Sequence, residues 1–100
     1  MSGEYFLGVD IGGTKTHALV ADAEGRAVGF GASGSGSWEL VGYDGLTAAL
    51  QEAVRPALEM AGLSLDDLAG AGLGMAGFDW SSQEQAHLDA ITAAGLHCPL

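Results

Sequence analysis

The sequence is poor in positive charge. Only three of its 100 residues are lysine or arginine, against 13 aspartates and glutamates, and the formal net charge is −10. A surface of this kind repels nucleic acids and anionic membranes, so we expect neither as a partner. One of the three bases, Lys15, stands within a glycine-rich segment. It is either the countercharge for a bound anion or an ordinary solvated turn residue.

Cysteine and long apolar runs are also scarce. Cys98 is the only cysteine, which excludes an intrachain disulfide and a cysteine metal cluster. His17, His87 and His97 lack metal-ligand spacing, and we expect them at or near the surface. No secretory signal pattern is visible, and no stretch reaches the roughly 18–20 apolar residues of a membrane span. A cytoplasmic location is the expectation.

Hydrophobic periodicity predicts a mixed α/β chain. Short apolar runs rich in β-forming residues predict strands at 5–11, 16–22, 27–33 and 69–76, and "LHCPL" at the end reads as the entry to another. Helical spacing of apolar residues predicts helices at 44–61 and 82–94. Gly25 suits a hairpin turn, Gly62 a helix C-cap, and Pro56 should kink or split the first helix. The order implies a mixed sheet covered by helices.

Residues 8–16, "GVDIGGTKT", have the ingredients of a phosphate loop. They do not form a P-loop, because Lys15 is one residue out of place and a predicted strand, not a helix, follows. Two G-x-G-x-x-G matches, at Gly29/Gly31/Gly34 and Gly72/Gly74/Gly77, lack the context of a dinucleotide site. What remains is a glycine turn between two antiparallel strands.

A strand–turn–strand segment of this composition can bind phosphate. Gly12 and Gly13 permit a tight turn with its amides facing an anion, Thr14 and Thr16 add hydroxyls, and Lys15 adds a charge. Asp10 ends a strand predicted to be buried, where a carboxylate is costly unless it has a partner. Its expected role is to orient a magnesium ion, through water, near phosphates. The alternative is a hairpin with a polar turn.

A second candidate segment is "GLGMAGFDW", residues 72–80. It ends a predicted strand, and ligands in open sheets bind beyond the carboxyl ends of strands. Phe78 beside Asp79 suits a sugar, which an aromatic face and a carboxylate can bind together. Alternatively, Asp79 or Ser81 caps the next helix. Trp38 could border the same site or anchor its loop by packing.

At these residues the chain resembles the N-terminal lobe of the sugar kinase/Hsp70/actin superfamily. "GVDIGGTKTHALVADAEG" is similar to the first phosphate motif and hairpin of the BadF/BadG/BcrA/BcrD ATPase family, which includes N-acetylglucosamine and glucosamine kinases. "GLGMAGFD" resembles its second glycine segment, and "GSGSWELVGYDGL" occupies its sugar-side loop. ROK sugar kinases and regulators share "GVDIGGTK" and are the alternative family.

The resemblance implies a ribonuclease H-like lobe, with ATP and magnesium as cofactors and a sugar hydroxyl, of glucosamine or N-acetylglucosamine, as the acceptor. It assigns magnesium to Asp10 and ATP phosphates to Gly12, Gly13, Thr14, Lys15 and Thr16. It places Ser37, Gly77, Phe78 and Asp79 beside the sugar. Ser37 stands where N-acetylglucosamine kinases carry a sugar-contacting asparagine, and this chain has no asparagine.

The family's general base and second phosphate motif would lie beyond Leu100. We therefore expect residues 1–100 to be a partial N-terminal lobe that is inactive alone, within a longer kinase that could form a homodimer. A competing function is an ATPase that activates a dehydratase or reductase through an iron–sulfur cluster, for which Cys98 alone gives little support. A ROK glucokinase or sugar-responsive regulator is a third, although no helix-turn-helix is apparent.

Overall fold

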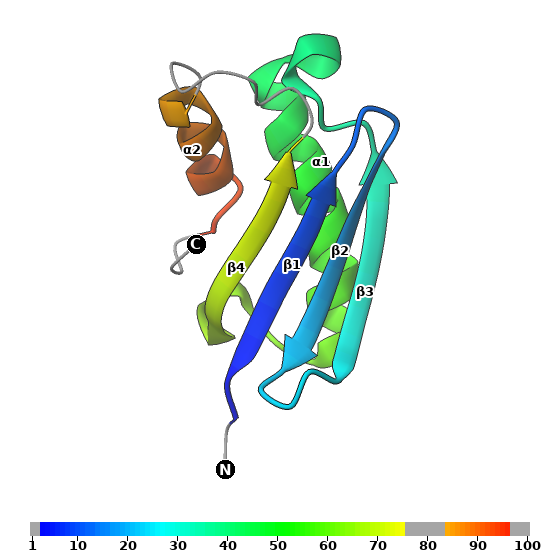
Figure 1. Cartoon of the computed structure of the whole chain (residues 1–100), viewed down its shortest axis with the longest axis vertical. Coiled ribbons are helices and arrows are strands. Elements are labelled where there is room, and N and C mark those ends of the chain that lie inside the picture. Colours follow the sequence, from blue (N-terminus) through cyan, green and yellow to red (C-terminus); the bar gives the residue numbers. More distant parts are fainter. Residues whose placement is uncertain (1–2, 76–83, 97–100) are drawn as a thin grey trace.

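The structure is a computed structural model that describes residues 3–75 and 84–96 (Figure 1). Four strands, two α-helices and one 3-10 turn follow one another in these residues. Their bounds in chain order are β1 Tyr5–Ile11, β2 Lys15–Asp22, β3 Ala27–Gly34, α1 Trp38–Ala61, η1 Leu65–Asp67, β4 Leu68–Met75 and α2 Glu84–Ala93. Each strand predicted within this range is confirmed to within one residue. The strand predicted from "LHCPL" and residues 82–83 of the second helix lie outside the described residues.

The strands form one mixed sheet in the order β3-β2-β1-β4. β1 pairs with β2 and β2 with β3 in antiparallel fashion, whereas β1 and β4 are parallel. Figure 1 shows α1 lying along one face of the sheet, and α2 beside β4 and α1. This arrangement confirms the predicted mixed sheet, in which an antiparallel meander precedes strand–helix units. Among the described residues, no helix is both long and apolar enough to cross a membrane.

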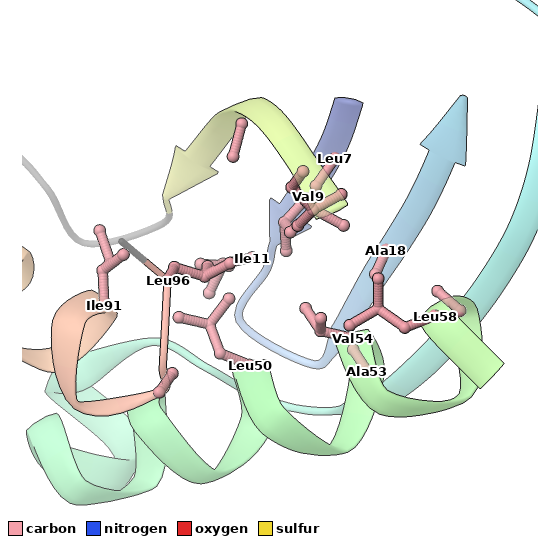
Figure 2. Packing of buried hydrophobic residues seen from close by; sticks show 14 of the residues in the cluster. Leu7, Val9, Ile11, Ala18, Leu50, Ala53, Val54, Leu58, Ile91 and Leu96 are labelled. Atoms are coloured by element: carbon pink, nitrogen blue, oxygen red, sulfur yellow. The ribbon is translucent and has the colours of Figure 1, made fainter. Parts of the chain in front are cut away.

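The core lies between the sheet and α1. Because successive side chains of a strand point to opposite faces, Leu7, Val9 and Ile11 of β1 all face α1 and are buried. Figure 2 shows these three side chains directed toward Leu50 and Val54 of α1. The opposite face of the sheet carries exposed apolar residues, namely Phe6, Leu19 and Phe30, and no described element covers it.

Two glycines of β3 set the distance between α1 and the sheet. A Cβ atom on Gly31 would lie 1.9 Å from the carbonyl oxygen of Ala53, and one on Gly29 would lie 2.0 Å from that of Ala57. No side chain fits at either position, so the helix backbone rests directly on the strand. These glycines, which form part of a literal dinucleotide motif, are therefore packing residues in the middle of a strand.

Of the predicted kink or split at Pro56, the split does not occur, because α1 continues through this residue. The only residue of α1 with non-helical backbone angles is Gly42, at φ 72° and ψ 176°, so the helix bends 14 positions earlier. The ring of Pro56 faces β3, where a Cβ on Gly31 would lie 2.8 Å from the proline Cγ. At its other end α1 stops at Gly62, which adopts the left-handed conformation that we predicted for a C-cap.

The β2–β3 hairpin is closed by one carboxylate. Asp22 Oδ1 accepts hydrogen bonds from the amides of Glu24 and Arg26, at 3.0 and 2.9 Å, and Oδ2 pairs with Arg26 Nε at 3.0 Å. Gly25 supplies the positive φ of 82° in the turn, as we predicted. The hydrogen bond from the Arg26 amide is the largest cause of a lowered pKa for the Asp22 carboxyl.

The glycine contact gives a first prediction. Gly31→Ala should lower the free energy of unfolding by about 1–3 kcal/mol, because the new methyl group overlaps the Ala53 carbonyl and forces α1 away. Gly72→Ala in β4 is the matched control, since a Cβ there meets no atom within 4 Å. The control should be neutral or slightly stabilising. Denaturant unfolding of both variants measures the difference, and equal stability would contradict the close packing of α1 on β3.

The hairpin carboxylate gives a second prediction. Because the pKa of Asp22 is lower in the folded chain, its ionised form stabilises the fold at neutral pH. That contribution is present above the unfolded-state pKa of about 3.9 and disappears as the pH falls through the lower folded value. Asp22→Asn should therefore melt at a lower temperature than the parent at pH 7, and the gap should narrow as the pH falls below the unfolded-state pKa of about 3.9. A gap that does not depend on pH would contradict it.

Candidate functional site

The carboxyl ends of β1, β3 and β4 meet at one edge of the sheet. In Figure 1 the turn after β1, the segment after β3 and the first turn of α1 all lie at this edge. It brings residues 10–16, predicted to bind magnesium and phosphate, near the segment that ends in Ser37, which the family resemblance places beside the sugar. The carboxyl ends of parallel strands are the usual position of ligands in open α/β sheets.

Asp10 lies on the open face of the sheet, at the end of β1. Its neighbours across the sheet are His17 of β2 and Gly74 of β4. The side chain is exposed, so the expectation that Asp10 is buried is wrong. Successive residues of a strand face opposite sides of the sheet, and Val9 and Ile11 on either side of Asp10 face the core. Asp10 therefore faces the open side. A Cβ on Gly74 would come 3.9 Å from Asp10 Oδ1, so the glycine leaves space beside the carboxylate.

The turn after Asp10 joins two antiparallel strands, as predicted. The amide of Gly12 donates to the carbonyl of Lys15 at 2.9 Å and closes the turn. Gly12 has to be glycine here, since a Cβ would lie 2.8 Å from the same carbonyl oxygen. Gly13, Thr14 and Lys15 are exposed at the tip, and a Cβ on Gly13 would meet no atom within 4 Å. The tip is therefore accessible to a ligand.

Lys15 is available to an anion at this tip. Of the chain's three basic residues, Arg26 is engaged with Asp22 and Glu24, each at 3.0 Å. In the part of the chain that the structure describes, Lys15 makes no ion pair with an acidic side chain. It thus places one uncompensated positive charge on the turn of a strongly acidic chain.

Thr16 differs from the rest of the predicted phosphate turn. Its side chain is fully buried, and its hydroxyl donates a hydrogen bond to the carbonyl of Gly34 at 2.9 Å. The strand parity explains this, since Thr16 pairs with Ile11 and shares its core-facing side. In this structure the Thr16 hydroxyl therefore holds the end of β3, whereas that of Thr14 belongs to an exposed residue.

The segment between β3 and α1 leads to Ser37, the residue predicted to face a sugar. Ser37 is 5% exposed and stands at the N-cap of α1, where its side chain makes no capping hydrogen bond. Its amide donates to Ser35 Oγ at 3.3 Å. The structure thus places Ser37 at the predicted edge but nearly buries its side chain, and its contact with a sugar stays a prediction.

An aromatic cluster holds the next residues in place. Trp38 stacks on Tyr43 with ring centroids 5.4 Å apart and an interplanar angle of 1°. His87 of α2 packs edge-on against both rings, and its Nδ1 lies 3.5 Å from the Tyr43 hydroxyl. The expectation that His87 is exposed or only lightly buried is wrong, because the residue is only 2% exposed. Of the two roles considered for Trp38, packing is the one observed.

The remaining predicted residues cannot be placed. Gly77, Phe78 and Asp79 fall within residues 76–83, outside the described residues, as do His97 and Cys98. Within the described ranges no three histidine, cysteine, aspartate or glutamate side chains gather as a metal site. A cation at this edge would therefore rely on Asp10 with water or ligand oxygens. The exposed carboxylate and the space beside Gly74 fit such an ion.

Sequence reasoning missed two features of this edge. The first is Gly36, whose amide donates to the carbonyl of Gly12 at 3.2 Å across 24 positions of sequence. The second is the row His17–Asp10–Gly74, which strand register creates. Alternation along β1 and β2 could have revealed the second, because Asp10 and His17 each stand between two core-facing residues and so share the open face. Nothing local in "GSGSW" signals the first.

Comparison with known proteins bears on this geometry. The model of the BadF/BadG/BcrA/BcrD ATPase family matches residues 7–98. A search of curated protein sequences finds no significant match. Among solved structures, a "Putative N-acetylglucosamine Kinase" from Chromobacterium violaceum superposes with a TM-score of 0.55 at 20% identity. The match covers 99% of this chain and 33% of that one, so the chain spans a third of its length. At this identity the likeness shows the fold alone. The family match covers nearly the whole chain, and the protein belongs to the BadF/BadG/BcrA/BcrD ATPase family.

Proposed function

We propose that this chain is the N-terminal part of an ATP-dependent kinase that phosphorylates a hydroxyl of an amino sugar such as glucosamine or N-acetylglucosamine. The observation that carries the proposal is the shared sheet edge, where β1 ends in exposed Asp10, the tip 13–15 after it is exposed, and the segment that enters α1 is hydrogen-bonded to the same turn. Family membership supports the use of ATP. The similarity of fold to an N-acetylglucosamine kinase supports a sugar as acceptor.

The proposed division of roles follows the geometry. Gly12 shapes the turn, and Gly13, Thr14 and Lys15 face the ATP phosphates with amide, hydroxyl and ammonium donors. Asp10 holds a magnesium ion through water, and that ion neutralises charge on the phosphates when bound. Ser37 borders the sugar, together with Gly77, Phe78 and Asp79 from outside the described residues. Each of these roles stays a prediction.

Phosphoryl transfer requires further groups. The acceptor hydroxyl must lie in line with the phosphate, and a base must take its proton. No described residue at this edge is assigned as that base, and we propose that it lies in the longer protein, beyond Leu100. Residues 1–100 then form a partial lobe whose activity depends on the remainder, in a full-length protein that is cytoplasmic and could be a homodimer.

The function is tested with the full-length protein and magnesium–ATP. We expect ATP consumption to rise at least about tenfold with glucosamine or N-acetylglucosamine over glucose or no sugar, and a phosphorylated sugar to form. Residues 1–100 alone should show no turnover. Hydrolysis of ATP at the same rate with and without every sugar would overturn the kinase and favour an ATPase that acts as an activator.

The assignment of Asp10 is tested by Asp10→Asn in the same protein. We expect kcat to fall about 10- to 100-fold or more, with a higher requirement for magnesium, because the amide cannot hold the hydrated ion in the same way. The exposed side chain predicts an unchanged melting temperature. Asp66→Asn, at an exposed position of η1, is the control and should retain full activity. Normal turnover by Asp10→Asn would show that the phosphate site is elsewhere.

A further inference from the structure

Two segments of the candidate site are joined by a pair of hydrogen bonds. The Thr16 hydroxyl donates to the Gly34 carbonyl at 2.9 Å, and the Gly36 amide donates to the Gly12 carbonyl at 3.2 Å. The first bond joins the paired ends of β2 and β3, and the second runs from the segment after β3 back to the turn. Together these four residues form what we call the turn–loop bridge. It ties the phosphate turn 12–16 to the segment 34–37, which enters α1.

The turn–loop bridge is closely packed. Thr16 is fully buried, and Gly36 lies against it. A Cβ on Gly36 would lie 2.5 Å from Ile11 Cγ2 and 3.1 Å from Thr16 Oγ1. The loop therefore cannot shift toward the turn without displacing Ile11 and Thr16, and a shift away from the turn breaks the hydrogen bond from Gly36 to Gly12. A displacement of either segment has to be followed by the other or cost a buried polar contact.

Thr14 and Thr16 differ in what their hydroxyl groups can reach. Thr14 is exposed at the tip, where a ligand can reach it, whereas the Thr16 hydroxyl already has an acceptor in the protein. Ser37 and Trp38 follow the bridge directly in the chain, and Trp38 stacks on Tyr43, which lies beyond the bend of α1 at Gly42. A movement of the turn would thus reach the residues that border the proposed acceptor site.

We infer that Thr16 is a positioning residue that couples occupation of the phosphate turn to the geometry of the acceptor loop 34–37, without itself contacting phosphate. This inference rests on the proposed function. Its consequence is energetic coupling: magnesium–nucleotide on the turn fixes the loop in the conformation that binds the sugar. Coupling of this kind is reciprocal, so the sugar tightens nucleotide binding by the same factor.

The test measures binding in the full-length protein with magnesium and β,γ-imido-ATP, and with glucosamine or N-acetylglucosamine. We expect the nucleotide to tighten sugar binding about 5- to 150-fold in the parent, the usual range of such coupling. Thr16→Val keeps the shape but removes the hydroxyl. It should reduce the coupling factor at least about fivefold, while each ligand alone binds within about threefold of the parent. Thr16→Ser should restore the coupling.

A second pair of variants tests the same contact without touching Thr16. Gly36→Ala should also lower the coupling, because its methyl group displaces the loop from Ile11 and Thr16. Gly34→Ala is the matched control, since a Cβ there meets no atom within 4 Å and the carbonyl acceptor is retained. Circular dichroism and thermal melting establish that each variant is folded, and the alanine pair decides the matter if Thr16→Val does not fold.

Four outcomes would overturn the inference. If Thr16→Val weakens nucleotide binding tenfold or more in the absence of sugar, Thr16 contacts phosphate directly. Coupling that is absent in the parent, or unchanged in Thr16→Val and Gly36→Ala, would remove the bridge from function while the kinase proposal stands. A parent protein that binds nucleotide but neither sugar would overturn the proposed function and this inference together.

Discussion

The close approach of α1 to β3 is the constraint on which the rest of the structure depends. Gly29 and Gly31 let the carbonyls of Ala53 and Ala57 rest on the strand, so the helix lies closer to the sheet than side chains would allow. The Ser33 hydroxyl adds a hydrogen bond of 2.7 Å to the Ala49 carbonyl. Since the segment before α1 is only three residues long, this docking leaves little freedom in where residues 35–37 cross the sheet edge.

The strands then divide the site between two faces. Even-numbered residues of β1 point to the open face and odd-numbered ones to the core. Asp10 is thereby presented to solvent while Ile11 beside it is buried. β2 repeats the alternation in the opposite sense, so Thr16 is directed into the core and His17 outward. The face of the sheet on which a polar residue lies therefore decides whether its side chain is open to a ligand or forms a hydrogen bond inside the protein.

Much of the fold could be predicted from the sequence because it depends on local patterns. Alternation in "YFLGVDI" and "THALVAD", together with Gly25 and Gly62, determined strands and turns to within about one residue. The helix is not split at Pro56, and its non-helical residue is Gly42, which the spacing of apolar residues did not mark. The burial of His87 was not predicted because its aromatic partners, Trp38 and Tyr43, are more than 40 positions away in the sequence.

In the candidate site, too, contacts between different strands could not be predicted from local sequence patterns. Composition grouped Thr14 and Thr16 as two hydroxyls for one phosphate, and only pairing with Ile11 and Gly34 separates them. A buried threonine whose hydroxyl is satisfied by a backbone carbonyl gains stability from that bond and would lose it by turning toward a ligand. The glycine turn consequently has two sides. Its exposed tip can receive phosphate, and its buried side is bound to the segment that begins α1.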